Sequence, residues 1–152
     1  MSVRVLAPVA GTVVAMTDVP DPVFAGSIVG PGIAVEPDGE GEVDVLSPVD
    51  GTIAKLHPHA FVVVTADGKG VLVHLGLDTV QLEGEGFTLH AQEKDTVAAG
   101  QRLVSWSPAA VKAGGRSPVS PVVALEGKQE ALTLAVEPGA PVNAGDELFT
   151  WG

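Results

Sequence analysis

A nine-residue stretch near the amino terminus recurs at an offset of 40 residues, and this repeat constrains the fold more than any other feature of the sequence. Residues 5–13 read VLAPVAGTV and residues 45–53 read VLSPVDGTI, with identity at Val, Leu, Pro, Val, Gly and Thr. A second pair, residues 97–106 and 142–151, shares the pattern V-x-A-G-x-x-L-x-x-W at an offset of 45. Repeats of this kind indicate that one supersecondary motif occurs twice. We therefore predict a fold with two related halves.

Both repeats favour turns between short β-strands. Pro and Gly in P-V-x-G-T fix a turn, and the β-branched residues that follow favour a new strand. Other short apolar segments, at 61–64, 71–73 and 132–136, are bounded by Gly, Pro and Asp. Such spacing is typical of a sandwich or barrel. Helical periodicity is scarce, and the best candidate is a turn or two over Pro108–Ala113 with Ser107 as its cap. We predict an all-β chain with minimal helix.

Composition excludes several classes of protein. Eight Lys and Arg against nineteen Asp and Glu give 8 − 19 = −11, the wrong sign for binding nucleic acid. Hydrophobic residues make up 45% and charged residues 18%, which argues against disorder. Without Cys the chain has no disulfide, thiolate nucleophile or Cys-based metal site. We see neither a signal peptide nor a membrane-spanning run, and we expect a cytoplasmic protein.

Two histidines fall on neighbouring segments of a predicted β-hairpin. If residues 66–69 form its loop, paired positions sum to 135 and His74 lies opposite Phe61. Because side chains alternate along a strand, His59 then shares the face of Phe61 and becomes a diagonal neighbour of His74. A three-residue loop would change the parity and separate the two imidazoles. The expected contact therefore depends on the length of this loop.

A pair of facing imidazoles has two chemical uses that the residues alone leave open. A neutral imidazole is a competent nucleophile toward phosphorus at pH 7, and a second imidazole can donate to the phosphoryl oxygens. The same pair could bind zinc, for which His57 and Asp78 are the nearest further ligands. A third interpretation is that each histidine is simply a hydrogen-bonded residue of the core.

The segment that follows His74 favours phosphoryl transfer. Residues 74–87 read HLGLDTVQLEGEGF and resemble the active-site signature of glucose-class enzyme IIA components of the bacterial phosphoenolpyruvate-dependent sugar phosphotransferase system. Further segments resemble the family in the family's order: 19–24, 29–34, 47–53, 59–61 and 120–123. The resemblance implies a single IIA domain over residues 1–152, folded as an antiparallel β-sandwich built from a duplicated motif. That expectation agrees with the repeats.

The resemblance also implies roles for individual residues. His74 corresponds to the phosphorylated histidine, which accepts the phosphoryl group from the carrier HPr and passes it to the cysteine of an enzyme IIB domain. His59 corresponds to the second active-site histidine, which hydrogen-bonds the phosphoryl group without carrying it. Asp78 would lie at the rim and meet Arg side chains of a partner. Apolar positions that surround the histidines and form the docking surface correspond to Phe24, Phe61 and Val80. For Phe61, burial in the core is the competing interpretation.

One position departs from the family. The family usually has Thr two residues before the second histidine, where this chain has His57 followed by Pro58. Orientation of His59 must then come from His57 or from the backbone. The substitution also allows adventitious zinc at His57, His59 and His74, although the family implies no cofactor. His90 matches no motif, and we expect it at the surface.

The remaining implications concern partners. The resemblance implies HPr, an enzyme IIB/IIC sugar permease at the inner membrane surface, and regulatory target proteins. The sequence does not identify the sugar, and it leaves open whether the domain is free-standing or part of a fused permease.

Two other functions deserve comparison with phosphoryl transfer. Lysostaphin-type zinc peptidases use an H-x-H strand like His57-Pro58-His59, but they need an earlier His, and none precedes His57. Biotin- or lipoate-carrying domains present a Lys at a hairpin tip. Lys69 lies at such a tip without the flanking residues that those domains use.

Overall fold

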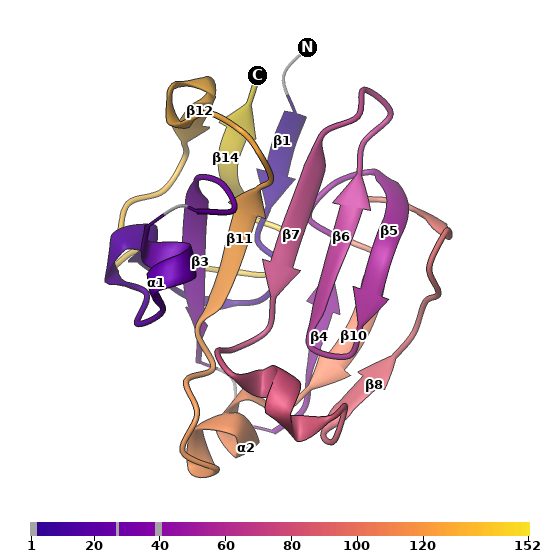
Figure 1. The fold of residues 1–152 in the computed structure, drawn as a ribbon, viewed down its shortest axis with the longest axis vertical. Coiled ribbons are helices and arrows are strands. Elements are labelled where there is room, and N and C mark those ends of the chain that lie inside the picture. Colours follow the sequence, from indigo (N-terminus) through magenta and orange to yellow (C-terminus); the bar gives the residue numbers. More distant parts are fainter. Residues whose placement is uncertain (1–2, 27, 39–40) are drawn as a thin grey trace.

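The computed structural model describes residues 3–26, 28–38 and 41–152, and its strands form three sheets (Figure 1). One sheet has eight strands in the order β13-β2-β3-β11-β7-β6-β5-β9, and two three-stranded sheets have the orders β1-β14-β12 and β4-β10-β8. All paired strands are antiparallel: β1 (Val3–Leu6), β2 (Gly11–Ala15), β3 (Gly32–Pro37), β4 (Val43–Leu46), β5 (Gly51–His57), β6 (Ala60–Val64), β7 (Gly70–His74), β8 (Phe87–Leu89), β9 (Thr96–Val97), β10 (Arg102–Trp106), β11 (Ser120–Ala124), β12 (Leu132–Leu134), β13 (Pro141–Val142) and β14 (Glu147–Trp151). The prediction of an antiparallel β-sandwich with minimal helix is confirmed.

The sequence repeats correspond to equivalent positions in the two halves. Strands β1 and β2 of the first half match β4 and β5 of the second. The second repeat begins at the end of β9 and of β13 and continues through β10 and β14. The halves also hydrogen-bond reciprocally, because the Leu6 amide donates to the Pro48 carbonyl and the Leu46 amide donates to the Pro8 carbonyl, each at 2.9 Å. The eight-stranded sheet is symmetric about its central β11–β7 pair. Strand β3 corresponds to β6, β2 to β5 and β13 to β9 at equal distances from that pair. The two repeats therefore form one interlocked sandwich.

Glycine in the P-V-x-G-T motif permits a close backbone approach. A Cβ atom on Gly11 would lie 2.1 Å from the Glu36 carbonyl oxygen, and one on Gly51 would lie 2.2 Å from the Val64 carbonyl oxygen. No side chain fits at such distances, so both positions require glycine. The same steric constraint thus acts at equivalent points of the two halves.

Two hydrophobic clusters hold the layers together. The main core includes Val5, Val45, Phe61, Trp106 and Phe149, each at most 1% exposed, and it draws on strands of all three sheets. The smaller cluster includes Met16, Val19, Phe24, Ala34 and Val123, which join the α1 region to β3 and β11. The smaller cluster anchors the segment that contains α1 (Pro22–Ala25) against the eight-stranded sheet.

Helices are short in this structure. The predicted helix over Pro108–Ala113 is present as α2, and the Ser107 hydroxyl caps it by accepting a hydrogen bond from the Ala110 amide at 3.2 Å. Helix α1 was not predicted, nor were three 3-10 turns: η1 (Met16–Asp18), η2 (Thr79–Leu82) and η3 (Gln129–Ala131). Across the described ranges, no helix has the length and apolar character that crossing a membrane requires.

Candidate functional site

A tight turn between β5 and β6 positions His59. His57 pairs with Ala60, so that Pro58 and His59 alone connect the two strands. Proline fixes its own φ near −65°, and His59 also has a negative φ, which makes this turn different from the usual left-handed hairpin turns. The His59 carbonyl then accepts a hydrogen bond from the Leu75 amide at 2.7 Å. This bond ties the backbone of His59 to the residue directly after His74.

The hairpin register differs from the predicted one. Ala60 pairs with His74 and Phe61 pairs with Val73, so paired positions sum to 134 and not to 135. The loop contains three residues, 66–68, because the Thr65 amide donates a hydrogen bond to the Lys69 carbonyl. The loop-length premise was therefore wrong. Strict alternation would separate the two imidazoles, but His59 lies in the turn, where alternation no longer applies. Its ring centroid lies 5.2 Å from that of His74, with an interplanar angle of 73°.

His74 ends β7 with one ring nitrogen held by the backbone. Its Nδ1 lies 2.6 Å from the carbonyl oxygen of Gly76. A carbonyl oxygen can only accept, so we assign the hydrogen to Nδ1 of the neutral ring. The other nitrogen, Nε2, then has a free lone pair. The backbone has thereby selected the tautomer that makes Nε2 nucleophilic.

The turn after His74 has a defined shape. Gly76 has φ +79°, and a Cβ atom there would lie 2.7 Å from Thr79 Cγ2 and 3.0 Å from the Ser117 carbonyl oxygen. The buried Thr79 hydroxyl donates to the Leu75 carbonyl at 2.7 Å, and the Leu77 amide donates to Ser117 at 2.9 Å. These contacts fix the carbonyl that accepts from His74.

An apolar side chain covers the ring of His74. Phe24 on α1 lies with its ring centroid 5.3 Å from that of His74, and it is itself buried. Three apolar side chains that are close in sequence to Phe24 or to His74 are exposed: Val23, Ile28 and Val80. Val80 is 59% exposed on η2, directly after the turn that follows His74. Phe24 thus contacts the ring of His74, and Val80 is exposed on the segment that follows it.

Phe61 does not belong to this surface. It is 1% exposed, lies in the main core and faces Val73 across the hairpin. The alternative that the sequence left open, burial in the core, is the correct one. The expectation that Phe61 helps to form a docking surface is wrong, because a buried ring offers a partner no contact area.

Burial dominates the electrostatics of the histidine pair. It lowers the pKa of His74 below the ordinary value of 6.5, whereas the Gly76 hydrogen bond and the charges of Asp21 and Asp78 oppose this shift. For His59, burial again lowers the pKa, and the neighbouring His74 and His57 lower it further. Both rings are therefore mainly neutral at pH 7.

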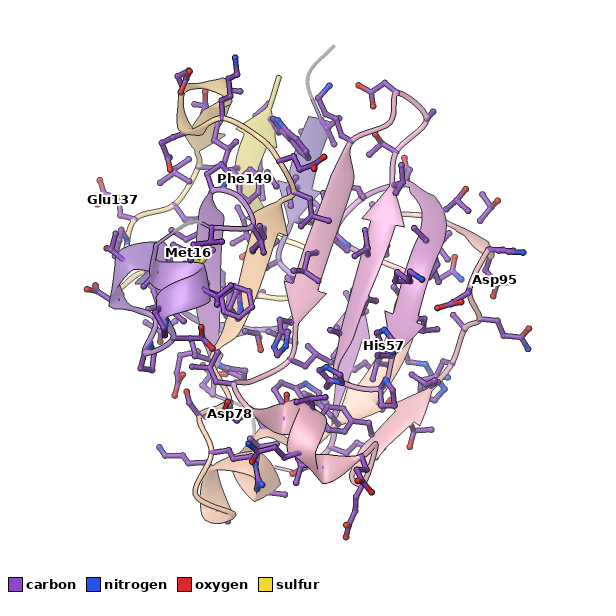
Figure 2. All side chains as sticks on the ribbon, viewed as in Figure 1. Met16, His57, Asp78, Asp95, Glu137 and Phe149 are labelled. Carbon is purple, nitrogen blue, oxygen red and sulfur yellow. The ribbon has the colours of Figure 1, made fainter. Side chains whose placement is uncertain are left out.

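The three clustered histidines form a row. His57 stacks on His59 at a centroid distance of 5.9 Å and an interplanar angle of 25°, and His59 in turn meets His74 edge to face. Figure 2 shows His57 at the end of β5 and Asp78 beyond the end of β7, at the same end of the sheet. Within residues 3–26, 28–38 and 41–152, no three Asp, Glu or His side chains gather in a way that could hold a metal ion. His57, His59 and His74, at which the sequence allows adventitious zinc, are therefore not arranged as a metal site in the described residues.

Two other residues considered from the sequence have different surroundings. His90 is exposed as expected, but its Nε2 lies 2.7 Å from the Ser105 hydroxyl, which donates to Asp44 at 2.9 Å. Lys69 follows the loop of the β6–β7 hairpin, where its ammonium lies 2.7 Å from Asp67 and over the Trp151 ring. Neither residue takes part in the site of His59 and His74.

Sequence reasoning missed two contributors to this site. The role of the Gly76 carbonyl could not be predicted, because every residue has a backbone carbonyl and the residue type does not show which one accepts a hydrogen bond. Asp21 acts on His74 electrostatically and also caps α1, its carboxylate accepting from the Val23 amide at 2.9 Å. The Asp-Pro pair at residues 21–22 is a helix-start signal that could have indicated it.

Comparison with known proteins identifies a single family. The family model described as phosphoenolpyruvate-dependent sugar phosphotransferase system, EIIA 1, matches residues 3–130. The glucose-specific EIIA component of Oceanobacillus iheyensis is 41% identical over 123 residues, which cover 80% of this chain and 73% of that protein. The glucose-specific EIICBA component of Streptococcus pneumoniae is 48% identical over 119 residues, covering 77% of this chain but 16% of that longer protein.

Among solved structures, the glucose permease IIA from Mycoplasma capricolum superposes with a TM-score of 0.86 and 32% sequence identity. The match covers 99% of this chain and 96% of that one. The arrangement of strands is therefore shared over nearly the whole chain.

Proposed function

The chain belongs to the EIIA 1 family of the phosphoenolpyruvate-dependent sugar phosphotransferase system, whose IIA components are phosphocarriers, and on that premise we propose that Nε2 of His74 carries the phosphoryl group. The observation that supports this assignment best is the 2.6 Å contact of His74 Nδ1 with the Gly76 carbonyl. It leaves a lone pair on Nε2 of a ring that is neutral at pH 7. Such a nitrogen attacks phosphorus without first losing a proton.

Phosphoryl transfer at this site is an in-line displacement. The Nε2 lone pair forms a bond to phosphorus while the bond between phosphorus and the donor's histidine nitrogen breaks, and the electron pair stays with the donor nitrogen. In the second step a cysteine thiolate attacks the same phosphorus and Nε2 leaves. Nδ1 keeps its proton against Gly76 throughout.

His59 is the proposed stabiliser of the transferring group. Its ring lies edge to face with that of His74, and an imidazole N–H there would donate to a phosphoryl oxygen. The ring of Phe24, which also contacts His74, would exclude water and so protect the phosphohistidine from hydrolysis. The site thus supplies positioning and charge stabilisation through protein groups alone.

The relatives also support a choice of partners. The proteins from Streptococcus pneumoniae and Bacillus subtilis are named as EIICBA and EIIBCA components, in which IIA, IIB and IIC parts share one chain. An enzyme IIB domain is therefore the supported acceptor. We further propose HPr as the donor, a IIB/IIC permease at the inner membrane surface as the acceptor assembly, and regulatory proteins as additional targets. These partners would place the protein in the cytoplasm.

The rim of the site suits a cationic partner. Asp78 is exposed, adopts a left-handed backbone with φ +58°, and acts electrostatically on His74 together with Asp21. We propose that Asp78 meets Arg side chains of HPr or IIB and that Val80 provides an apolar contact beside them.

A reconstituted relay tests the proposed function. Incubation with phosphoenolpyruvate, enzyme I and HPr should add one phosphoryl group, which acid removes and base does not. His74→Ala should abolish labelling. His59→Ala should accept the phosphoryl group, but its rate of transfer to IIB should be lower than that of the wild type by about 100-fold or more. His90→Ala is the matched control, since it removes an imidazole outside the site and should leave the relay intact. Labelling that persists in His74→Ala would refute the assignment.

A further inference from the structure

His59 lacks an evident polar support for its ring. Its backbone is fixed by Pro58 and by the bond from the Leu75 amide, but these leave the side chain free to rotate about χ1 and χ2. Among the described residues, no hydrogen bond to either ring nitrogen of His59 is found. A ring that must donate to a transferring phosphoryl group needs a defined orientation, because misplacement by about 1 Å costs about 100-fold in rate.

The neighbouring ring that could supply this orientation is His57. It lies nearly parallel to His59, at 5.9 Å and 25°, whereas the ring of His74 meets that of His59 edge to face at 5.2 Å and 73°. Offset stacking at such centroid distances is a favoured arrangement of aromatic rings. His59 therefore contacts two imidazoles, one of them the proposed nucleophile and the other outside the reaction.

The placement of His57 is itself rigid. It is the last residue of β5 and pairs with Ala60, the first residue of β6, across the two-residue turn. The preceding amide, of Leu56, donates to the Glu93 carboxylate at 3.0 Å, and the following Pro58 packs against the loop at Gly84, where a Cβ atom would lie 3.2 Å from Pro58 Cγ. The backbone of His57 is thus fixed through both of its neighbours in the chain, Leu56 and Pro58.

From this geometry we infer that His57 is a positioning residue for phosphoryl transfer. Its ring stacks on His59 and restricts that side chain to the orientation in which it faces His74. The inference rests on the proposed function, in which His59 stabilises the group carried by His74. His57 itself does not touch the phosphoryl group.

Single-turnover transfer from the phosphorylated protein to IIB tests the inference. His57→Ala should slow the maximal rate by about 10-fold to 100-fold while leaving the KM for IIB nearly unchanged, because the partner surface is intact. His57→Phe should restore most of the lost rate, since it returns a flat ring without a titratable nitrogen. Thermal unfolding of both variants should match the wild type, because His57 is exposed.

A spectroscopic readout separates positioning from a general structural effect. In His57→Ala, the NMR couplings that report χ1 of His59 should average over rotamers, whereas in the wild type and in His57→Phe they should indicate one rotamer. His90→Ala, which removes another exposed imidazole, should change neither the rate nor the couplings.

Three outcomes would overturn the inference. They are wild-type transfer by His57→Ala, failure of His57→Phe to restore the rate, or a single His59 rotamer in His57→Ala. The proposed function fails separately, if the wild-type protein itself is not phosphorylated on His74. A wild type that is labelled on His74 beside a fully active His57→Ala would reject only the role of His57.

Discussion

At the scale of single residues, the surroundings of His74 influence the protonation of its ring in two opposed directions. Burial against Phe24 and the sheet disfavours the charged ring, while Asp21, Asp78 and the Gly76 carbonyl favour it. The balance keeps the ring neutral at pH 7 and leaves its Nε2 free. Sequence identified this residue and His59, but it could not reveal the acceptor that fixes the tautomer, because every residue has a carbonyl.

The titration of His74 follows from this balance. Its pKa is lowered, so the ring should stay neutral from pH 8 down past the ordinary value of 6.5 and gain its proton only below it. Asp78→Asn removes a charge that raises the pKa, and should therefore move the midpoint to still lower pH. NMR titration of the His74 ring protons in both proteins measures the two midpoints. A wild-type midpoint above 6.5, or an upward shift in Asp78→Asn, would contradict this explanation.

At the scale of elements, the site depends on turns more than on strands. In the observed register, a His59 that continued strand β6 would point to the opposite face of the sheet from His74. His59 lies instead in the two-residue turn with Pro58, and there its ring meets that of His74. Strands and α2 could be predicted because alternation, Gly, Pro and a capping Ser leave clear signals. Asp21-Pro22 marks the start of α1, but its four residues contain no helical period, so its position over His74 could not be predicted.

The turn at Gly76 offers a test at this scale. Gly76→Ala should lower the free energy of unfolding by about 1–3 kcal/mol and slow phosphorylation of His74, because the new Cβ atom would clash with Thr79 and move the carbonyl that accepts from Nδ1. Denaturant unfolding and the rate of labelling by phospho-HPr measure the two effects.

Gly100→Ala is the control for Gly76→Ala. Gly100 has a similar left-handed φ of +88°, but a Cβ atom there would have open space. It should lose stability through backbone strain without loss of phosphorylation rate. Equal rates in the two variants would show that the Gly76 turn does not govern His74.

At the scale of the whole molecule, the sandwich consists of two related halves, and both histidines of the proposed site belong to one of them. Reciprocal bonds between Leu6 and Pro48 and between Leu46 and Pro8 join the halves, while His59 and His74 both come from the second half. The repeats predicted two related halves and the fold class. They could not predict the order of strands in the eight-stranded sheet, because an offset along the chain does not say which strands pair.

The net charge of −11 gives a further prediction for the whole molecule. A strongly acidic chain should associate faster with a partner that has a basic surface, and salt should screen this attraction. The association rate with HPr should therefore fall as ionic strength rises from about 0.05 M to about 0.5 M, and less steeply for Asp78→Asn. Stopped-flow phosphorylation at several salt concentrations measures both slopes. A rate that is independent of salt would contradict electrostatic steering.

The most direct test of the central claim is to determine which nitrogen carries the phosphoryl group. The protein is phosphorylated through phosphoenolpyruvate, enzyme I and HPr after labelling of its histidines with ¹⁵N, and the ring nitrogens are then observed by NMR. Because Nδ1 of His74 donates to the Gly76 carbonyl, the phosphorus coupling should appear on Nε2 of His74, with Nδ1 still protonated. Phosphorus on Nδ1 of His74, or on either nitrogen of His59, would contradict the account.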